Sequence, residues 1–292
     1  MKTILYIFII VMTGSIVLTA LPGPQGRNDT IINLKCTEQN VDSSALQKAL
    51  YTMEQRLVQC GIEHFKTKAD AGSSTISIKI SDSVNRTIVV DLLTIPGKIE
   101  FYETGIKETF LSQNKENDCL RVFMKLSVNK DLTGAGYEDV LGYFHEADKR
   151  NLAYCIEGKS SNTPGKEEVK LVWGYKRNNL DLYPLYLLKS TPFLDGISIT
   201  ESKAQTDENG MSYLLILFNR KGSDVWSRIT RQNINKPVAM VLDERVYFAP
   251  VVRNEISGGK CQISGNFSHD EILMLAAIIE SGELPAKFIQ LK

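Results

Sequence analysis

One long apolar segment near the N-terminus sets the first limit on how this chain can fold. Apolar residues dominate from Thr3 to Leu21, directly after Lys2, and the run ends at Pro22. About 19 such residues just span a hydrocarbon core of ~30 Å. The next longest apolar run, Ile272–Ile279, is far too short for that. We therefore expect at most one membrane span, with the rest of the chain folded outside the membrane.

The N-terminal segment has two interpretations, and the sequence leaves both open. A basic start, an apolar stretch and the small residue Ala20 are typical of a secretory signal that is cleaved after Ala20. Residues 1–21 can equally remain in place as a membrane anchor. In both cases the following part is exported, and residues 22–30 form a linker that is rich in Pro and Gly at its start.

The composition excludes several classes of protein. The chain has 292 residues, of which 43% are hydrophobic, and its 34 Lys and Arg balance 34 Asp and Glu. This hydrophobic fraction is typical of a globular protein, and the length is sufficient for two or more folded units. Because the formal net charge is zero, the chain lacks the net basic charge that nucleic-acid phosphates attract. We expect no nucleic-acid partner.

Five cysteines are widely scattered along the chain: Cys36, Cys60, Cys119, Cys155 and Cys261. They form no C-x-x-C pair of the kind found in zinc or thioredoxin sites. In an oxidising compartment one or two disulfides are possible, with one thiol left over. The positions of Cys36, Cys60 and Cys261 favour small buried apolar side chains. The sequence does not determine which cysteines pair.

The region that begins at residue 31 alternates between strand and helix patterns. Within Ile76–Ile80 each isoleucine alternates with a polar residue, as in a strand with one buried face. An earlier strand is expected at Ile31–Leu34, followed by a helix that is capped within residues 42–44. An apolar stretch at 88–93 and a strand at Lys98–Glu103 come next. This order predicts a small α+β unit of ferredoxin-like type.

The middle of the chain, residues 107–190, shows weaker patterns than the rest. We expect strands over Arg121–Leu126, Val169–Trp173 and Leu182–Leu188, and a helix over Tyr137–Lys149. Polar loops are expected at residues 133–136 and 160–165.

The last third of the chain carries the clearest signals. Apolar runs at 238–242 and 245–252 flank Asp243-Glu244 and predict a hairpin, although its turn lacks the Gly that type I′ turns prefer. Ser268 and Glu271 form a capping box that begins an apolar, buried helix. Further elements are expected as strands over Met211–Phe218, Cys261–Ser264 and Phe288–Leu291, a helix over Gly222–Gln232, and a helix end at Gly282.

Motifs for common enzymatic sites are absent from the sequence. The chain has no G-x-G-x-x-G, phosphate-binding G-x-x-x-x-G-K-[ST], G-x-S-x-G or H-E-x-x-H pattern. We therefore expect a protein that is not an enzyme, with no catalytic residues, no cofactor and no metal. A hydrolase assembled from distant residues would require His64, His145 or His269 to lie beside a nucleophile.

Four blocks in the last 60 residues carry a resemblance to a known family. They are Lys236–Asp243 (KPVAMVLD), Val246–Val252 (VYFAPVV), Ile256–Ser268 (ISGGKCQISGNFS) and Ser281–Ala286 (SGELPA). In order and spacing they resemble the first periplasmic (P1) domain of the protein-export membrane protein SecD and of fused SecDF chains. Upstream stretches at 92–104, 169–175 and 183–189 are similar to the same domain.

The resemblance implies a fold and a division of the chain. The fold would be α+β, a ferredoxin-like base with an inserted α+β head subdomain of SecD P1 type. Residues 31–190 would belong to the base-like region, residues 191–285 to the head, and residues 286–292 to a returning strand. Lys292 falls where the second membrane helix of the family would begin. The later membrane helices, with their proton-coupling residues, have no counterpart here, so we do not extend the proton-driven motor to this chain.

The resemblance also implies a role and a location. We expect a non-enzymatic accessory to preprotein translocation, or to the handling of polypeptides that emerge outside the membrane. Its partners would be exported or unfolded polypeptides, translocon subunits and, through the N-terminal segment, the inner membrane. Its location would be the periplasmic side of the bacterial cytoplasmic membrane. The alternative is a stand-alone envelope recognition module that uses the same fold without the translocon.

Three aromatic residues are candidates for polypeptide binding. Tyr247, Phe248 and Phe267 lie near predicted turns, whereas most residues of the matched blocks are explained by buried strands and turns. An exposed strand edge in the head is a further candidate, because an extended polypeptide can pair with such an edge through main-chain hydrogen bonds.

Overall fold

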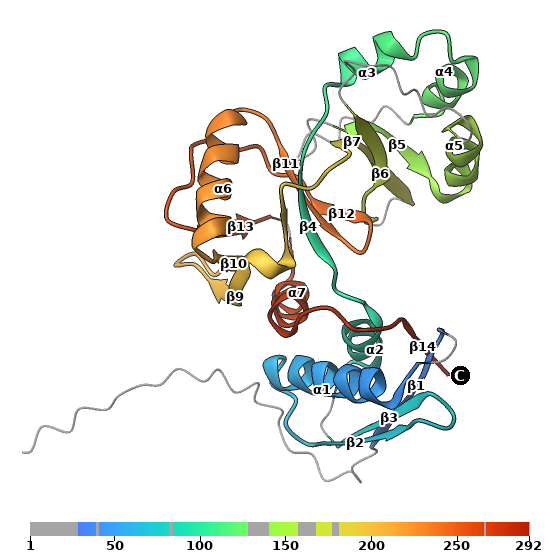
Figure 1. The fold of residues 1–292 in the computed structure, drawn as a ribbon, viewed down its shortest axis with the longest axis vertical. Helices are drawn as coiled ribbons and strands as arrows, with labels where there is room; N and C mark the ends of the chain where they lie inside the picture. Colours follow the sequence, from blue (N-terminus) through green and yellow to red (C-terminus); the bar gives the residue numbers. More distant parts are fainter. Residues whose placement is uncertain are drawn as a thin grey trace, which may run out of the picture.

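The computed structural model describes residues 29–38, 41–81, 84–127, 140–156, 168–176, 181–265 and 267–291 (Figure 1). The expected signal or anchor at 1–21, the linker up to residue 28, and the expected loops at 133–136 and 160–165 lie outside these residues. Within the described part, no helix is both long and apolar enough to cross a membrane.

A four-stranded antiparallel sheet forms the base of the molecule. The strand order is β14-β1-β3-β2. The base elements are β1 (Thr30–Cys36), α1 (Ser43–Gln59), β2 (Phe65–Asp70), β3 (Thr75–Ile80), α2 (Arg86–Thr94) and β14 (Phe288–Gln290). The sequence of elements, βαββαβ, and this strand order are the ferredoxin-like arrangement that was expected.

Helix α1 covers one face of the base sheet. The Asp42 carboxylate accepts a hydrogen bond from the Ala45 N–H at 2.6 Å and so begins the helix. Of its apolar residues at spacings of three and four, Leu46, Met53 and Leu57 are buried and Leu50 is half-buried. The alternating isoleucines of β3 meet them from the sheet, as predicted, with Ile78 also fully buried. One face of the base sheet is therefore buried in the hydrophobic core, and the other face is exposed.

The fourth strand of the base differs from the sequence-based expectation. Residues 98–103 do form a strand, β4 (Ile99–Glu103), but it pairs with β11 (Val238–Leu242) in another sheet. The base is closed instead by β14, which pairs with β1 near the end of the chain. The apolar stretch at 88–93 lies in α2. A strand pattern shows that a segment is half-buried, but it does not identify the partner strand.

The head of the inserted region contains two sheets and two helices. Its sheets have the orders β13-β10-β9 and β12-β11-β4-β8. Besides β4 and β11, its elements are β8 (Leu194–Asp195), a 3₁₀ turn (Gly196–Ser198), β9 (Ile199–Thr206), β10 (Ser212–Phe218), α6 (Arg220–Gln232), β12 (Arg245–Phe248), β13 (Lys260–Ser264) and α7 (His269–Ser281). The strands and helices expected in this third of the chain are present.

The predicted hairpin at Asp243-Glu244 connects β11 and β12. Both turn residues have positive φ, 49° and 66°, which is the type I′ conformation without glycine. Strand β12 ends at Phe248, four residues before the expected end, because the chain then bends to form isolated bridges at Val251 and Val252.

The middle of the chain forms a fourth sheet with three α-helices. The sheet order is β5-β7-β6, and a disulfide joins Cys119 to Cys155. The elements are α3 (Lys107–Gln113), α4 (Asp118–Met124), β5 (Val140–His145), a 3₁₀ turn (Glu146–Asp148), α5 (Lys149–Ile156), β6 (Val169–Trp173) and β7 (Leu182–Lys189). The disulfide therefore links α4 to α5, whereas Cys36, Cys60 and Cys261 are free thiols.

Two expectations for this middle region were wrong. The strand expected at 121–126 falls largely in α4, because Leu120 and Phe123 share one buried face at helical spacing and Asn117 caps the helix. The helix expected at 137–149 is replaced by β5, the 3₁₀ turn and the start of α5. Strand β5 is buried on both faces, and a continuous apolar run does not distinguish a buried strand from a helix.

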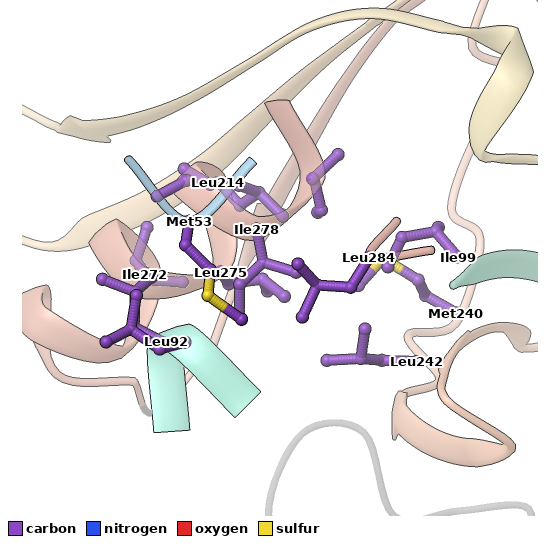
Figure 2. Close-up of a cluster of buried hydrophobic side chains, with 14 of the residues drawn as sticks. Met53, Leu92, Ile99, Leu214, Met240, Leu242, Ile272, Leu275, Ile278 and Leu284 are labelled. Atoms are coloured by element: carbon purple, nitrogen blue, oxygen red, sulfur yellow. The ribbon is translucent and has the colours of Figure 1, made fainter. Parts of the chain in front are cut away.

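Helix α7 joins the base to the head. Its capping box is formed as predicted, and six of its apolar residues are buried. Ile272, Leu275 and Ile278 lie among Met53 and Leu92 of the base and Leu214 of the head, as Figure 2 shows. Base and head therefore share one continuous hydrophobic core rather than two separate ones.

Two segments cross between base and head: the outgoing segment connects α2 to β4, and the returning segment connects α7 to β14. Arg56 binds both of them. Its guanidinium donates hydrogen bonds to the carbonyl oxygens of Ile95 and Pro96 in the outgoing segment, at 2.5 and 2.9 Å, and to that of Gly282 in the returning one, at 3.0 Å. The two segments also contact each other, since the Leu284 N–H donates to the Pro96 carbonyl oxygen at 2.8 Å. Burial lowers the Arg56 pKa to about 10, so the side chain remains charged at neutral pH.

The hairpin turn of the head binds the outgoing segment from the other side. The Asp243 carboxylate accepts hydrogen bonds from the Gly97 and Lys98 N–H groups at 3.0 and 2.9 Å. A Cβ at residue 97 would lie 2.7 Å from Arg56 Nη2, and the φ of Gly97 is 95°, so this position requires glycine. The outgoing segment is thus held between a base cation and a head anion.

We expect Arg56→Met to lower the free energy of unfolding by about 3 kcal/mol or more, because several buried carbonyl groups lose their donor. Denaturant unfolding followed by tryptophan fluorescence would measure the change. Arg231→Met is the matched control: Arg231 forms an exposed ion pair with Glu255, and such pairs contribute little. Equal unfolding midpoints for the two variants would contradict the assignment of Arg56 as the junction's main polar contact.

Candidate functional site

The three aromatic residues singled out from the sequence lie together in the structure. The ring centroids of Tyr247 and Phe248 are 6.0 Å apart, those of Tyr247 and Phe267 are 6.1 Å apart and stacked, and those of Phe248 and Phe267 are 6.3 Å apart. Tyr175 adds a fourth ring, 5.2 Å from Tyr247 and edge-on to it. We refer to these four residues as the aromatic cluster.

Members of the aromatic cluster differ in solvent exposure. Tyr175, Tyr247 and Phe267 are half-buried, so part of each ring is available at the surface. Phe248 is only 7% exposed and packs into the core. Of the three candidates, Phe248 therefore packs beneath the surface, while Tyr247 and Phe267 are partly exposed to solvent.

A short bridge between two sheets brings Tyr175 to the cluster. Gly174 forms an isolated bridge with Val246 of β12, and the Tyr175 N–H donates to the Val246 carbonyl oxygen at 3.0 Å. The Arg245 guanidinium lies 5.8 Å from the Tyr175 ring centroid, within range of a cation–π contact. Burial raises the Tyr175 pKa to about 12, so its hydroxyl stays neutral at physiological pH.

Phe248 also forms part of the wall of a cavity beside the cluster. The cavity has a volume of about 280 Å³ and is lined mainly by apolar side chains. Its lining comprises Phe101, Trp226, Val238, Met240, Phe248, Pro250, Val251, Val252, Arg253, Asn254, Ile256, Cys261, Gln262 and Ile263. An apolar cavity of this size, with few polar groups, suits a large apolar side chain rather than a charged ligand.

Two residues that line the cavity, Phe101 and Trp226, belong to a buried aromatic group that also includes Phe218. The ring centroids of Trp226 and Phe101 are 5.3 Å apart, and those of Trp226 and Phe218 are 5.1 Å apart. Within the described residues, the buried Trp226 Nε1–H has no hydrogen-bond partner. Unpaired buried N–H groups are costly, and this one leaves a donor unsatisfied in the core next to the cavity.

A strand edge borders the same cavity. Residues 261–263 of β13 line it, and β13 is an edge strand that pairs only with β10 among the described strands. Its residues alternate between buried and exposed, so Cys261 and Ile263 face the core while Gln262 is exposed. An extended peptide that paired along this edge would place alternate side chains toward the cavity.

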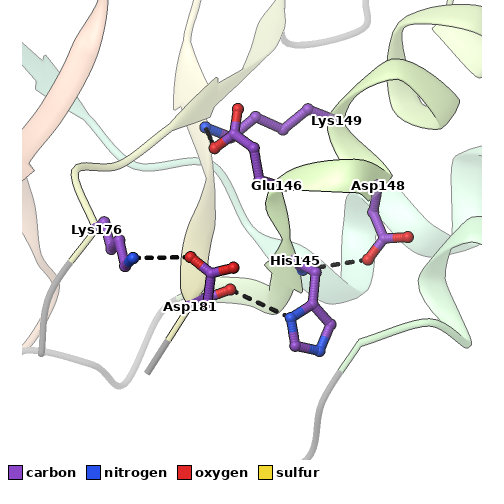
Figure 3. Close-up of polar contacts among 6 residues, drawn as sticks. All are labelled: His145, Glu146, Asp148, Lys149, Lys176 and Asp181. Atoms are coloured by element: carbon purple, nitrogen blue, oxygen red, sulfur yellow. Dashed lines mark hydrogen bonds and ion pairs between the residues drawn. The ribbon is translucent and has the colours of Figure 1, made fainter. Parts of the chain in front are cut away.

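His145 and His269 lie in separate, local hydrogen-bond networks. At the end of β5, His145 and Asp148 form a capping box, and His145 Nδ1 lies 3.2 Å from the Asp181 carbonyl oxygen, as Figure 3 shows. The same figure shows two ion pairs nearby, Glu146 with Lys149 and Lys176 with Asp181. These contacts close one end of the middle sheet.

His269 lies beside a hydroxyl group. Its Nδ1 lies 3.0 Å from Ser212 Oγ, which connects the start of α7 to the start of β10. No carboxylate of the described residues orients His269, so the pair lacks the third member of a catalytic triad. In the same part of the chain, no group of three His, Cys, Asp or Glu side chains is placed to hold a metal ion.

Sequence reasoning missed the residues that surround the three candidates. Tyr175 and Trp226 are distant from β12 along the chain, and Cys261 was expected only as a buried thiol. Tyr175 sits in one of the resembling stretches, 169–175, but nothing in its local pattern indicates that it meets Tyr247. Only the pairing of Gly174 with Val246 determines that contact.

Comparison with known proteins agrees with this architecture. Residues 174–286 match the family model of the SecDF P1 head subdomain. The fold is that of the SecD P1 domain. A SecDF structure in a super-membrane-facing form matches 90% of this chain and 29% of its own, with a TM-score of 0.52 and 22% identity. A second, described as a membrane component that enhances protein export, matches 90% of this chain and 98% of its own, with a TM-score of 0.51 and 21% identity.

Curated relatives carry the same family names. SecD from Calditerrivibrio nitroreducens is 40% identical over 102 residues, which are 35% of this chain and 20% of that protein. SecDF from Thermus thermophilus is 39% identical over 94 residues, 32% of this chain and 13% of that protein. SecD from Magnetococcus marinus is 26% identical over 260 residues, 86% of this chain and 47% of that protein. The chain thus spans less than half the length of these relatives.

All members of the aromatic cluster except Phe248 are half-buried, and all four lie within the part that matches the P1 head subdomain. The cavity lining also lies there, apart from Phe101 of β4. Strand β4 comes from a point more than 70 residues before the matched part and completes the sheet beside β11. The candidate site therefore depends on a strand that lies outside the head's own stretch of sequence.

We expect the Cys261 thiol to react slowly with iodoacetamide at pH 8, because burial raises its pKa to about 12 and leaves roughly one thiolate in 10⁴. The rate should rise about tenfold per pH unit between pH 8 and 10, as long as the fold persists. Peptide mapping by mass spectrometry would measure it, with the urea-unfolded chain as control. Fast labelling of the folded chain at pH 8 would show that the cavity wall opens readily.

Proposed function

We propose that this chain is a non-enzymatic, polypeptide-binding protein that assists preprotein export on the outer side of the cytoplasmic membrane. The main support for this proposal is the aromatic cluster, which lies beside an apolar cavity and a strand edge. All three lie within or next to the part that matches the P1 head subdomain. The proposal extends to this chain the description of the related SecDF as a membrane component that enhances protein export.

The geometry is suited to unfolded clients of varied sequence. Main-chain hydrogen bonds along the β13 edge would be available to any extended segment, since every residue except proline offers the same N–H and C=O groups. Tyr247 and Phe267 would add contact area through partly exposed rings. The cavity would receive one large apolar side chain from the client. Such a site binds many exported chains and selects for apolar content rather than for one sequence.

In this proposal residues 1–21 tether the protein to the inner membrane, and the described region faces the periplasm. The Cys119–Cys155 disulfide is consistent with an oxidising compartment. Translocon subunits are the expected neighbours, because the relatives are named protein translocase subunits. Proton coupling does not form part of the proposal.

We expect the double variant Tyr247→Ala with Phe267→Ala to bind an unfolded exported polypeptide about tenfold more weakly. Each half-exposed ring contributes on the order of 1 kcal/mol of contact, and 1.4 kcal/mol corresponds to a factor of ten. Fluorescence anisotropy with a labelled, reduced client would measure the dissociation constant. Tyr51→Ala is the matched control, since Tyr51 is a 63% exposed aromatic residue on α1, in the base. Unchanged affinity in a folded double variant would exclude the aromatic cluster.

In-cell photo-crosslinking from position 247 separates the two roles that the sequence left open. Position 247 is preferred to 248, because Phe248 is buried and a bulky probe there would disturb the core. Capture of translocon subunits, or of many different exported chains, would support the accessory role. Reproducible capture of one unrelated envelope protein would instead show that the fold serves as a stand-alone recognition module.

A further inference from the structure

The base sheet has one face that no described element covers. Helices α1 and α2 lie on the inner face, and the opposite face points away from the rest of the molecule (Figure 1). On β1 the exposed residues alternate with the buried residues Ile32 and Leu34, so one face of the strand is buried and the other is exposed. We refer to the uncovered side as the outer face. Its charged and apolar residues are Asp29, Ile31, Lys35, Lys66, Lys68, Asp70, Lys79, Ile289 and Leu291.

The outer face concentrates positive charge in a chain whose net charge is zero. This face carries four lysines and only two carboxylates. The Lys79 ammonium lies 2.6 Å from Asp29. Within the described residues, Lys35, Lys66 and Lys68 form no ion pair. Three ammonium groups on this face are therefore available to an external anion.

The strand register makes this arrangement costly. Lys79 on β3 lies directly opposite Lys66 on β2. Like charges in directly opposed cross-strand positions destabilise a sheet unless an anion compensates them. Asp29 pairs with Lys79, whereas Lys66 forms no ion pair with any described residue, so the charge of Lys66 is not compensated within the described part of the chain.

Apolar side chains lie beside these lysines. Ile31 is opposite Lys79 and 51% exposed, and Ile289 is opposite Lys35 and 53% exposed. Leu291, which is 40% exposed, continues this row through a backbone hydrogen bond to the Asn33 carbonyl oxygen. Lysines next to exposed isoleucine and leucine are typical of surfaces that lie in the headgroup region of a membrane.

We propose that the outer face of the base sheet docks on an anionic lipid surface. The choice of a bilayer rests on the proposed N-terminal tether. Residues 22–29 separate the apolar run from β1, and eight residues span at most about 28 Å when fully extended. Asp29, the last of them, is paired with Lys79 on the outer face itself. A second copy of the chain is a poor partner for this face, because two lysine-rich faces repel each other.

Residue-resolved lysine labelling tests the proposal. The full-length chain is reconstituted in phosphatidylcholine vesicles, with or without about 30% phosphatidylglycerol, and treated with a membrane-impermeant amine reagent. In the anionic vesicles we expect labelling of Lys66 and Lys68 to fall at least about threefold, and to recover in about 0.5 M salt, which screens surface charge. Lys48, exposed on α1, is the control and should not change.

Two variants separate docking from general proximity to the membrane. Lys66→Glu with Lys68→Glu should abolish the protection of Lys35 and Lys79, whereas Lys66→Arg with Lys68→Arg should preserve it, because the charge is retained. Equal labelling in the two vesicle types would overturn the proposal, as would protection that persists in neutral vesicles. Protection that appears only after an acidic protein is added would assign the face to a protein partner and overturn it as well.

Failure of the tether can be distinguished from failure of the docking face. If the chain does not float with the vesicles, the proposed anchor is wrong. The same labelling is then repeated with vesicles added to the chain in solution, and salt-sensitive protection is still expected, because the lysines themselves supply the attraction. Its absence there overturns the proposal.

Discussion

The buried guanidinium of Arg56 holds together the point where the chain leaves the base and the point where it returns. Both segments expose backbone carbonyls at this junction, and a buried carbonyl without a donor is costly. One side chain satisfies carbonyls of both segments. Asp243 holds the outgoing segment from the head side. The insertion of a large head into a small sheet depends on this arrangement. More than 190 residues separate the end of α2 from β14, and β14 must still return to pair with β1.

The candidate site depends on similarly distant pairings. Strand β4 supplies Phe101 to the cavity, the stretch after β6 supplies Tyr175 to the aromatic cluster, and β12 supplies Tyr247 and Phe248. The matched P1 head subdomain contains most of this surface, but not all of it. Tyr247 and Phe267 pack against the core that α7 extends into the base, so a client bound there would contact side chains that adjoin this shared core.

Local patterns predicted much of this structure. The alternation within 76–80, the capping box at Ser268 and the Asp243-Glu244 hairpin each depend on neighbouring residues, and each is found. The helix in place of the 121–126 strand, and the strand in place of the 137–149 helix, are failures of the same method, since short apolar runs fit both periods. Arg56 gave no sequence signal, because an arginine on an amphipathic helix is normally exposed. Tyr247, Phe248 and Phe267 could be named from the sequence, but their contact with Tyr175 could not, since it arises from pairing between separate sheets.

The late arrival of β14 has a consequence for how the protein is made. A chain that emerges N-terminus first presents β1, β2 and β3 long before their fourth neighbour exists. Until then the β1 edge carries unpaired N–H and C=O groups, which are a template for wrong pairing. Contacts between residues this far apart in sequence form slowly. The base is therefore the first part of the folded region to be synthesised and the last to be completed, and a holding partner would be most useful to this protein during its own biogenesis.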